Sequence, residues 1–476
     1  MLSDYLYSRL LANLEFEPTP SQDQLLKLLS GFAISPSSEH IFIIKGYAGT
    51  GKTTIVNAFV QTLTEIKQKS VMLAPTGRAA KVLSGYSHTQ AFTIHKKIYR
   101  QKSGKDGLGD FSLDRNLHKS TFFLVDEASM IGDKVLDNNI FGSGDLLRDL
   151  IEYVQSGTDC FLILIGDTAQ LPPVGLEISP ALDKKHLERM GMRVTEFFLT
   201  DIVRQALDSG ILENATRIRQ QISDGDVTMP RIKTDNFPDI IPISGSDILE
   251  AIENCYSRYG ESETIVISRT NKRANQFNAG IRNQILWKEE EIASGDLLMV
   301  VKNNYFWNSP ENNLDFIANG DIARLEKIYR YQTIYDLRYA DVRLSLIDYN
   351  NLEVEAKILI DTLTLETASL SSEQQRELFE KVMGDYEDIP LRKERIKKVR
   401  ENPNFNALQV KFAYAVTCHK AQGGQWKAVF IDLGYFKEEM LNIEYLRWLY
   451  TAFTRATEQL YLVNFPEGFF LNLSGL

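Results

Sequence analysis

The 476-residue sequence predicts an α/β protein with two parallel-sheet lobes and a small β-barrel inserted into the second lobe. In residues 1–205, helical patterns alternate with short apolar strands, namely IFIIKG, SVMLAPT, TFFLVDEAS and CFLILIGD. Apolar strands bounded by helical segments indicate a parallel sheet covered on both faces. The pattern returns at 263–271 and, near the C-terminus, in WKAVFIDLG and EQLYLVNF. Dense alternation of polar and apolar residues from 296 to 362 indicates a small antiparallel barrel.

Composition limits the classes of protein that fit. Hydrophobic residues make up 43% of the chain, which is enough for several buried cores. No apolar run is long enough to span a membrane, and the start, MLSDYLYSRLL, lacks a basic region followed by an apolar one, so we expect neither a span nor a secretion signal. Separated cysteines (Cys160, Cys255, Cys418) and six histidines without metal-ligand spacing argue against disulfides, zinc and iron–sulfur clusters, and fit a reducing cytoplasm.

The formal net charge of −10 bears on the kind of partner. It argues mildly against nucleic acid, because neutralisation of phosphates dominates such binding. An acidic exterior can nevertheless surround a basic channel, so the net charge leaves this question open.

A glycine-rich turn follows the first predicted strand. GYAGTGKT, at 46–53, satisfies the pattern G-x-x-x-x-G-K-T between a strand and a helix. Glycines let backbone N–H groups approach phosphates closely, and the helix N-terminus adds positive potential. We expect Lys52 to reach the β- and γ-phosphates of ATP and Thr53 to ligate Mg²⁺. The predicted nucleotide-binding residues of this segment are Gly46, Ala48, Gly49, Thr50, Gly51, Lys52, Thr53 and Thr54.

The next two buried strands also end in polar residues. Asp126 and Glu127 end the strand before ASM, and we assign Asp126 to the metal ion and Glu127 to the attacking water. An acidic strand end is common on α/β surfaces, so the upstream phosphate loop carries much of this assignment. Gln170 follows the next strand and could orient water as a glutamine does in GTPases. The alternative is a polar loop stiffened by Pro172 and Pro173.

Two arginines are candidates for contacts with transferred phosphate. Arg455 lies in LYTAFTRAT, at 449–457, a motif of the second lobe. An arginine in such a motif suggests an arginine finger that reaches across a cleft to the nucleotide. Arg204, in LTDIVRQ, is the second candidate. For either arginine the alternative is a surface salt bridge.

The motifs stand in a family order: GYAGTGKTT, APTGRAAKVL, TIH, VDEASM, GDTAQLPPV, VRQ, SRTN, HKAQGGQW and YTAFTRA. By this ordered set, the chain resembles superfamily I, subfamily B DNA helicases of the RecD-like and Dda-like group. The resemblance implies two RecA-like lobes that bind ATP between them, closure that drives translocation along a single strand, and an SH3-like inserted barrel.

The resemblance also implies roles for individual residues. Arg204 and Arg455 match the family's γ-phosphate contacts, and Gln422 and Gly423 match the motif that couples ATP to DNA. Gln22 matches the glutamine that recognises adenine, with Gln24 as a close rival. The chain departs from the family at Gly424, where serine is usual, and it carries no nuclease motif.

A strand of DNA needs positive charge along its backbone and surfaces on which bases stack. The resemblance places APTGRAAKVL (74–83) and TIHKK (93–97) on the DNA face of the first lobe and adds HKAQGG from the second. Each cation is also explained by a solvated surface, and His95 by a hydrogen-bonded structural histidine. The predicted DNA-binding residues are Pro75, Thr76, Arg78, Lys81, His95, Lys96, Phe111, Thr417, His419 and Lys420.

Two further segments leave alternatives open. Residues 97–120 interrupt the strands at the position where the resembling helicases carry a strand-separating hairpin, and Phe111 is the residue best able to stack on a base. The alternative is a surface loop. RKERIKKVR, at 392–400, predicts a charged helix that either meets DNA or is solvated, and solvation is the commoner fate of such runs.

We therefore expect a first lobe at 1–205, a second lobe at 206–295 and 405–476, and the barrel with its charged helical region at 296–404. The expected function is a monomeric ATP-dependent helicase that acts on single-stranded and tailed duplex DNA, and the resemblance favours 5′-to-3′ movement. The alternative is a DNA-stimulated ATPase that remodels DNA or serves in a complex without separating strands. A non-motor P-loop protein, such as a small-molecule kinase, does not explain HKAQGG and TAFTRA together.

Overall fold

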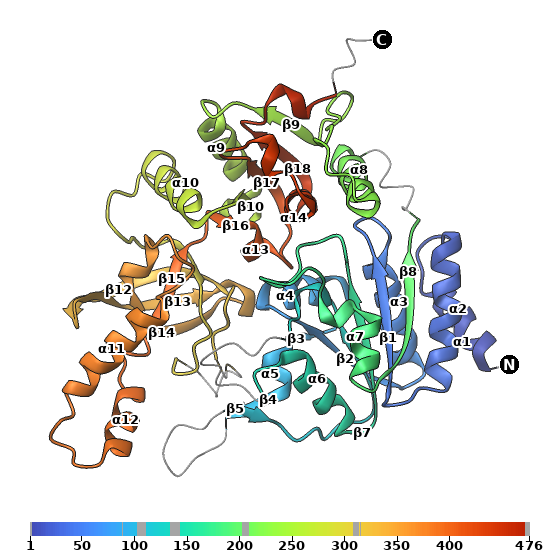
Figure 1. The fold of residues 1–476 in the computed structure, drawn as a ribbon, viewed down its shortest axis with the longest axis horizontal. Helices are drawn as coiled ribbons and strands as arrows, with labels where there is room; N and C mark the ends of the chain where they lie inside the picture. The colour runs from blue at the N-terminus through green and yellow to red at the C-terminus, as the bar shows by residue number, and fades with distance from the viewer. Residues whose placement is uncertain are drawn as a thin grey trace.

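A computed structural model describes residues 2–87, 89–101, 111–133, 143–201, 209–307, 314 and 316–471, without the side chains at 101 and 111. The first lobe, in blue to green, lies at the right of Figure 1, the second lobe at the top and the barrel at the left. Within the described ranges, no helix is long and apolar enough to cross a membrane.

The first sheet has six strands in the order β3-β2-β6-β7-β1-β8, and all its pairs are parallel. Side chains of β1 alternate between two cores: Ile41 and Ile43 pack on one face, and Phe42 and Ile44 pack on the other. Helices therefore cover both faces, as the apolar strands predicted. The strands are β1 His40–Gly46, β2 Lys69–Ala74, β3 Ala91–Thr93, β6 Lys119–Val125, β7 Thr158–Gly166 and β8 Arg193–Leu199. The helices are α1 Leu2–Ala12, α2 Pro20–Ile34, α3 Lys52–Glu65, α4 Gly77–Ser87, α5 Ile94–Ile98, α6 Leu146–Gln155 and α7 Lys184–Arg189.

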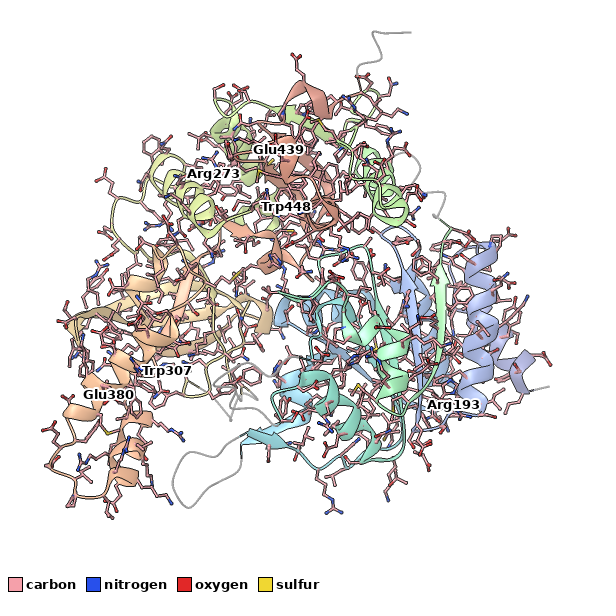
Figure 2. The ribbon with its side chains drawn as sticks, viewed as in Figure 1. Arg193, Arg273, Trp307, Glu380, Glu439 and Trp448 are labelled. Atoms are coloured by element: carbon pink, nitrogen blue, oxygen red, sulfur yellow. The ribbon has the colours of Figure 1, made fainter. Side chains whose placement is uncertain are left out.

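The second sheet has five strands in the order β16-β10-β17-β18-β9, again with parallel pairs. A two-point ion pair ties helix to sheet here, because Arg273, which is labelled in Figure 2, contacts the buried carboxylate of Asp432 at 2.7 and 3.1 Å. The strands are β9 Ile240–Ile243, β10 Thr264–Ser268, β16 Ala415–Thr417, β17 Trp426–Asp432 and β18 Ala456–Val463. The helices are α8 Gly210–Asp224, α9 Ile248–Tyr259, α10 Asn271–Gln284, α13 Cys418–Ala421 and α14 Ile443–Phe453.

The inserted barrel is closed by five strands, so it leaves none of their edges unpaired. Its pairs are antiparallel apart from β14 with β15. The fold class predicted from the sequence, two parallel-sheet lobes with a small barrel, is confirmed. The strands are β11 Leu297–Val300, β12 Ile322–Ile334, β13 Leu337–Leu346, β14 Leu352–Leu359 and β15 Leu408–Phe412, and helices α11 Ser372–Gly384 and α12 Arg392–Arg400 precede β15.

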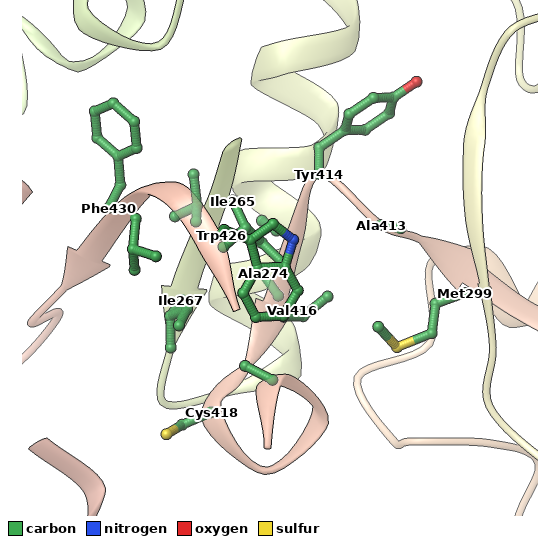
Figure 3. Packing of buried hydrophobic residues seen from close by; sticks show 14 of the residues in the cluster. Ile265, Ile267, Ala274, Met299, Ala413, Tyr414, Val416, Cys418, Trp426 and Phe430 are labelled. Atoms are coloured by element: carbon green, nitrogen blue, oxygen red, sulfur yellow. The ribbon is translucent and has the colours of Figure 1, made fainter. Parts of the chain in front are cut away.

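The fifth barrel strand, β15, lies in the range that the sequence assigned to the second lobe. The domain division itself stays a prediction. The barrel and the second lobe share one hydrophobic core, in which Val416 and Trp426 of the lobe join Met299 and Ala413 of the barrel chain (Figure 3). The barrel is therefore packed against the second lobe by apolar contacts.

The segment between α5 and β6 contains a short antiparallel pair, β4 Tyr99–Gln101 and β5 Phe111–Leu113. Tyr99 pairs with Leu113, and Gln101 with Phe111. The two arms of a hairpin are thus present where the sequence predicted one, and residues 102–110 lie outside the described residues. Short 3-10 helices complete the described structure: Ala128–Met130, Pro180–Leu182, Glu261–Glu263, Ile347–Tyr349, Ile360–Leu363, Glu438–Met440 and Glu467–Phe469.

Candidate functional site

Three neighbouring strands of the first sheet bring the phosphate loop, Asp126 and Asp167 to one edge. The phosphate loop follows β1, Asp167 follows β7, and Asp126 follows β6, in adjacent positions of a parallel sheet. Ligands of open parallel sheets bind at the carboxyl ends of the strands. Burial raises the pKa of the carboxyl groups of Asp126 and Asp167. The positive charge of Lys52 acts against this rise in both cases.

The phosphate loop adopts a conformation that requires glycine. Gly49 and Gly51 have φ angles of 76° and 79°, in the left-handed region that side chains disfavour. Nζ of Lys52 donates hydrogen bonds to the carbonyls of Gly46 and Tyr47 at 2.7 and 2.8 Å. The loop therefore wraps around the ammonium group, and α3 begins directly behind it. Thr53 and Thr54 lie in the first turn of α3, where backbone N–H groups can bind phosphate.

Gln22 lies against the phosphate loop. Its Nε2 donates to the carbonyl of Thr50 at 3.0 Å, and its Oε1 accepts the backbone N–H of Thr19 at 2.9 Å. Gln22 is 3% exposed, whereas Gln24 is exposed to solvent. The structure thus places Gln22, and not its rival Gln24, against the phosphate loop.

Asp126 and Glu127 lie together where β6 ends. Burial and then the charge of Glu127 raise the pKa of Asp126 to about 6. The backbone N–H of Glu127 donates to Oδ1 of Asp126 at 2.8 Å. Glu127 has a φ of 52°, a conformation that costs free energy in a residue other than glycine and is common at functional sites.

Arg455 reaches this pair from the second lobe. Its Nη1 lies 3.9 Å from Oε1 of Glu127. The guanidinium is also fixed by the carbonyls of Thr451 and Gly424, at 3.1 and 3.2 Å. At 3% exposed, Arg455 is not a surface salt-bridge residue. Arg204, the other predicted arginine, lies outside the described residues.

Two residues of the second lobe form hydrogen bonds with the loop after β7. Nε2 of Gln422 donates to the carbonyl of Leu171 at 2.7 Å, and the N–H of Leu171 donates to Oγ1 of Thr451 at 2.9 Å. Gln170 is buried beside them, and its Oε1 has no hydrogen-bond partner among the described residues. The two predicted glutamines therefore lie in the loop region where the lobes meet.

A second contact between the lobes involves Tyr450 and Asp167, which the sequence did not single out, and Ala48 of the predicted phosphate loop. The hydroxyl of Tyr450, on α14, donates to Oδ2 of Asp167 at 2.6 Å and accepts the N–H of Ala48 at 2.9 Å. Asp167 is 1% exposed, so this bond supplies a partner that water cannot. Both residues occur in the motifs GDTAQLPPV and YTAFTRA, but nothing in either motif indicates that they bond to each other.

The glycines after Gln422 allow a close approach of the chain. Gly423 has a φ of 73°, and a Cβ there would lie 2.8 Å from the Cβ of Ala79 on α4. A Cβ at Gly424 would collide with the indole of Trp426. This collision gives a physical reason for glycine where the resembling family usually has serine.

Predicted DNA-binding residues of the first lobe lie on and beside α4 and α5. Oγ1 of Thr76, next to Pro75, accepts the N–H of Ala79 at the start of α4. Arg78 stacks on Trp426, 5.1 Å from the ring centroid, and donates to the carbonyl of Gln425 at 3.1 Å. Lys81 lies on α4, and His95 and Lys96 lie on α5. Burial lowers the pKa of His95 to about 4, so this ring is neutral near pH 7.

The second lobe contributes Thr417 at the end of β16, and His419 and Lys420 on α13. Burial lowers the pKa of both His419 and Lys420, the latter to about 8. The Phe111 side chain lies outside the described part of the structure, although its backbone belongs to β5.

The barrel contacts several of these cations, which the sequence did not predict. Asp348 lies 3.6 Å from Nη1 of Arg78 and 3.5 Å from Nζ of Lys81. Nζ of Lys420 donates to Oδ1 of Asn319 at 2.5 Å. No local sequence pattern predicts such contacts, because they depend on how the barrel packs against the two lobes.

Two family profiles match the chain. One, described as an AAA domain, matches residues 30–234, and another, described as a UvrD-like helicase C-terminal domain, matches residues 412–463. The first match includes the phosphate loop, Asp126 and Gln170, and the second includes Gln422 and Arg455.

Curated relatives are distant. The ATP-dependent RecD2 DNA helicase of Deinococcus radiodurans is 23% identical over 437 residues, which cover 89% of this chain and 47% of that protein. The ATP-dependent DNA helicase dda of Enterobacteria phage T4 is 25% identical over 277 residues, which cover 56% of this chain and 57% of that protein. The chain thus matches about half the length of each of these two helicases. An uncharacterized protein of Acanthamoeba polyphaga mimivirus is 22% identical over 501 residues, covering 90% of this chain and 96% of that protein.

Among solved structures, a Pif1 helicase from Bacteroides in complex with ADP-AlF3 and single-stranded DNA aligns with a TM-score of 0.46 and 14% identity, covering 96% of this chain and 95% of that chain. A Pif1 helicase from Candida albicans aligns with a TM-score of 0.44 and 14% identity, covering 96% and 97%.

Proposed function

Because the chain is related to the superfamily I, subfamily B helicases RecD2 and Dda, we propose that it is an ATP-dependent DNA helicase that moves on single-stranded DNA and unwinds duplexes. The observation that carries this proposal is the meeting of Arg455, from the second lobe, with Glu127 of the first lobe at 3.9 Å. A P-loop protein that only binds nucleotide does not need an arginine from a second α/β lobe at its catalytic carboxylate.

The predicted residues are assigned the following roles in ATP binding and hydrolysis. Lys52 binds the β- and γ-phosphates, and Glu127 holds the attacking water and accepts its proton. Arg455, together with Arg204, stabilises the negative charge that develops on the transferred phosphoryl group. Gln170 orients water, and Gln22 recognises adenine beside the loop.

Mg²⁺ fits the oxygen donors present. The Thr53 hydroxyl and the Asp126 carboxylate would hold it, since Mg²⁺ is bound through few protein oxygens together with phosphate oxygens. The buried Asp126 carboxyl, whose pKa is raised partly by Glu127, is a site at which a cation relieves crowded negative charge. The bound ion would neutralise phosphate charge during transfer.

Coupling to DNA runs through the loop that contains Gln422 and Gly423. Gln422 bonds to the loop after β7, which carries Gln170, and Gly423 lies against α4, which carries Arg78 and Lys81. A nucleotide-driven change at the cleft therefore acts on the surface predicted to bind DNA. Thr76, His95, Lys96, Thr417, His419 and Lys420 complete that surface in our proposal.

Strand separation is the finer part of the proposal. The β4–β5 pair supplies two arms of a hairpin in the segment to which the resemblance gives strand separation, and we assign that role to it, with Phe111 stacking on a base. Movement is proposed to be 5′-to-3′, on the resemblance alone. The competing function, a DNA-stimulated ATPase without strand separation, needs no working hairpin.

Duplexes with a single-stranded tail at either the 5′ or the 3′ end test this proposal. We expect ATP-dependent release of the short strand from 5′-tailed duplex only, and loss of release with unchanged DNA-stimulated ATP hydrolysis in Phe111→Ala. ATP hydrolysis that DNA stimulates, with no release from either duplex, would favour the remodeller. Release from the 3′-tailed duplex alone would contradict the proposed direction.

A further inference from the structure

The 3-10 helix Ile347–Tyr349 of the barrel lies against α4 of the first lobe. Its Asp348 side chain is fully buried, 3.6 Å from Nη1 of Arg78 and 3.5 Å from Nζ of Lys81. Nζ of Lys81 also donates to the carbonyl of Ile347 at 3.2 Å. Two cations predicted to bind DNA phosphate are therefore in contact with an anionic group of the same chain.

A second barrel carboxylate, that of Asp321, lies against the first residue of α4, Gly77. Asp321 is fully buried, and its Oδ2 accepts the N–H of Ala318 at 2.7 Å and the hydroxyl of Tyr349 at 3.0 Å. Its Oδ1 has no hydrogen-bond partner within the described ranges of the chain, and a Cβ at Gly77 would collide with it. Glycine at the first position of α4 thus lets this carboxylate reach the backbone of APTGRAAKVL.

The two carboxyl groups form an acidic pair next to a basic helix. Burial, and then the charge of Asp348, raise the pKa of Asp321 to about 7, while the charge of Lys96 acts in the opposite direction. Buried carboxylates are costly unless they are paired with cations. The cations that pair with Asp348 are Arg78 and Lys81, which the sequence predicted to bind DNA.

We propose that Asp348 competes with DNA phosphate for the cations of α4, Arg78 and Lys81, so that the barrel sets the affinity of the first lobe for single-stranded DNA. The inference rests on the proposed function, which places the strand along α4. A phosphate that reaches Arg78 and Lys81 must replace the Asp348 carboxylate. The free energy gained from each phosphate contact is therefore reduced by the cost of breaking an internal ion pair. Removing the carboxylate charge removes the competing anion, and the cations keep only neutral partners such as the carbonyls of Gln425 and Ile347.

The opposite arrangement predicts the opposite sign. If the acidic pair instead holds the barrel closed over an already bound strand, removing its charge loosens that closure and weakens binding. Asp348→Asn keeps the shape of the side chain and removes only the charge. The direction of the change in affinity therefore separates competition from closure.

Binding of the full chain to a fluorescein-labelled oligothymidylate, followed by anisotropy in the absence of nucleotide, measures this effect. We expect Asp348→Asn to tighten binding about fivefold, the scale of one ion pair. We also expect a steeper dependence of affinity on salt, by about 0.7 in the log–log slope for each cation that gains a phosphate. Asp321→Asn changes a carboxyl group that contacts neither cation, so it should change the affinity less than Asp348→Asn.

Asp361→Asn is the matched control. Asp361 is also a barrel carboxylate, but it pairs with Arg338, at 2.5 Å from Nη2, and its substitution makes the same change in net charge. Tighter binding in Asp348→Asn but not in Asp361→Asn supports competition. Equal affinity in all variants, or weaker binding in Asp348→Asn while its thermal unfolding matches the parent, overturns it. A parent chain that binds no oligothymidylate would instead refute the proposed function on which the inference rests.

Discussion

The hydroxyl of Tyr450 donates a hydrogen bond of 2.6 Å to Oδ2 of Asp167, and it accepts one of 2.9 Å from the N–H of Ala48. A single hydroxyl on α14 of the second lobe thus contacts both the phosphate loop and the end of β7 in the first lobe. Burial raises the pKa of Tyr450 well above its usual value, so this group stays protonated and remains a donor. Any motion between the lobes changes the surroundings of this bond.

Tyr450→Phe tests whether this bond positions the phosphate loop. The variant keeps the ring but leaves the buried Asp167 carboxylate and the Ala48 N–H without their partner, which costs about 1–3 kcal/mol. If that cost falls on the closed, catalytically competent arrangement, DNA-stimulated kcat drops roughly tenfold, since each 1.36 kcal/mol is a factor of ten. Steady-state ATP hydrolysis with saturating DNA measures kcat and KM separately.

Tyr435→Phe is the control for Tyr450→Phe. Tyr435 is 72% exposed and lies in the same lobe, so removing its hydroxyl should change neither kcat nor the melting temperature. A purely structural role for Tyr450 would lower the melting temperature and leave kcat and KM at parental values.

Arg455 and Glu127 should separate ATP binding from ATP hydrolysis. We expect Arg455→Ala to lower kcat on the order of 10³-fold, the scale of a lost arginine finger. Glu127→Gln should bind ATP as tightly as the parent and hydrolyse it far more slowly, because the amide cannot accept the proton of water. A fluorescent ATP analogue reports binding, and single-turnover hydrolysis reports the chemical step. Near-parental turnover in either variant contradicts the roles assigned here.

The steric argument at Gly424 predicts coupling with Trp426. Gly424→Ser places a Cβ against the indole, and overpacking of this kind costs about 1–3 kcal/mol. Trp426→Leu opens space for that Cβ, so the double variant should be less destabilised than the sum of the two single variants. Chemical or thermal unfolding of the four proteins gives the coupling free energy, and strictly additive effects would show that the collision is not what excludes serine.

DNA binding should weaken as the solution becomes more alkaline. Burial lowers the pKa of Lys420 to about 8 in the free protein, and a nearby phosphate favours the charged form, so the pKa is higher in the complex. Binding therefore takes up a proton, and affinity falls as the pH rises from about 7 to about 9. Lys420→Arg stays charged throughout and should flatten this dependence. Lys411, whose pKa is lowered to about 8 by burial and then by the charge of Lys420, is present in both proteins. Parallel pH curves for parent and variant would remove Lys420 from the DNA surface.

The central strands were predictable because burial on both faces leaves a mark in the sequence. β7 is buried along seven consecutive residues, and its apolar run is continuous. The edge strand β8 is only partly buried, so polar residues such as Glu196 interrupt its apolar pattern and no strand was predicted there. Polar and apolar residues alternate along β12 strongly enough to indicate the barrel. β15 is separated from the other barrel strands by a charged helical segment, so its pairing with β11 was not predicted.

Some residues of the candidate site could also be predicted from the sequence, and others could not. Lys52, Asp126, Glu127 and Arg455 lie in motifs whose residue order carries their chemistry, and the structure brings their charged groups close together. Contacts between lobes and with the barrel depend on docking, for which no local pattern exists. The bond from Tyr450 to Asp167 and the approach of Asp348 to Arg78 are of this kind. Sequence periodicity predicts which face of an element is buried, but not which residue of another lobe meets it.

ATP hydrolysis with and without single-stranded DNA, by the parent chain and by Lys52→Ala, tests the central claim most directly. The account predicts a large stimulation by DNA in the parent and none in the variant, which loses the group that binds the β- and γ-phosphates. Hydrolysis by the parent that is indifferent to DNA would contradict the link between the phosphate loop and HKAQGGQW, and with it the helicase function proposed here.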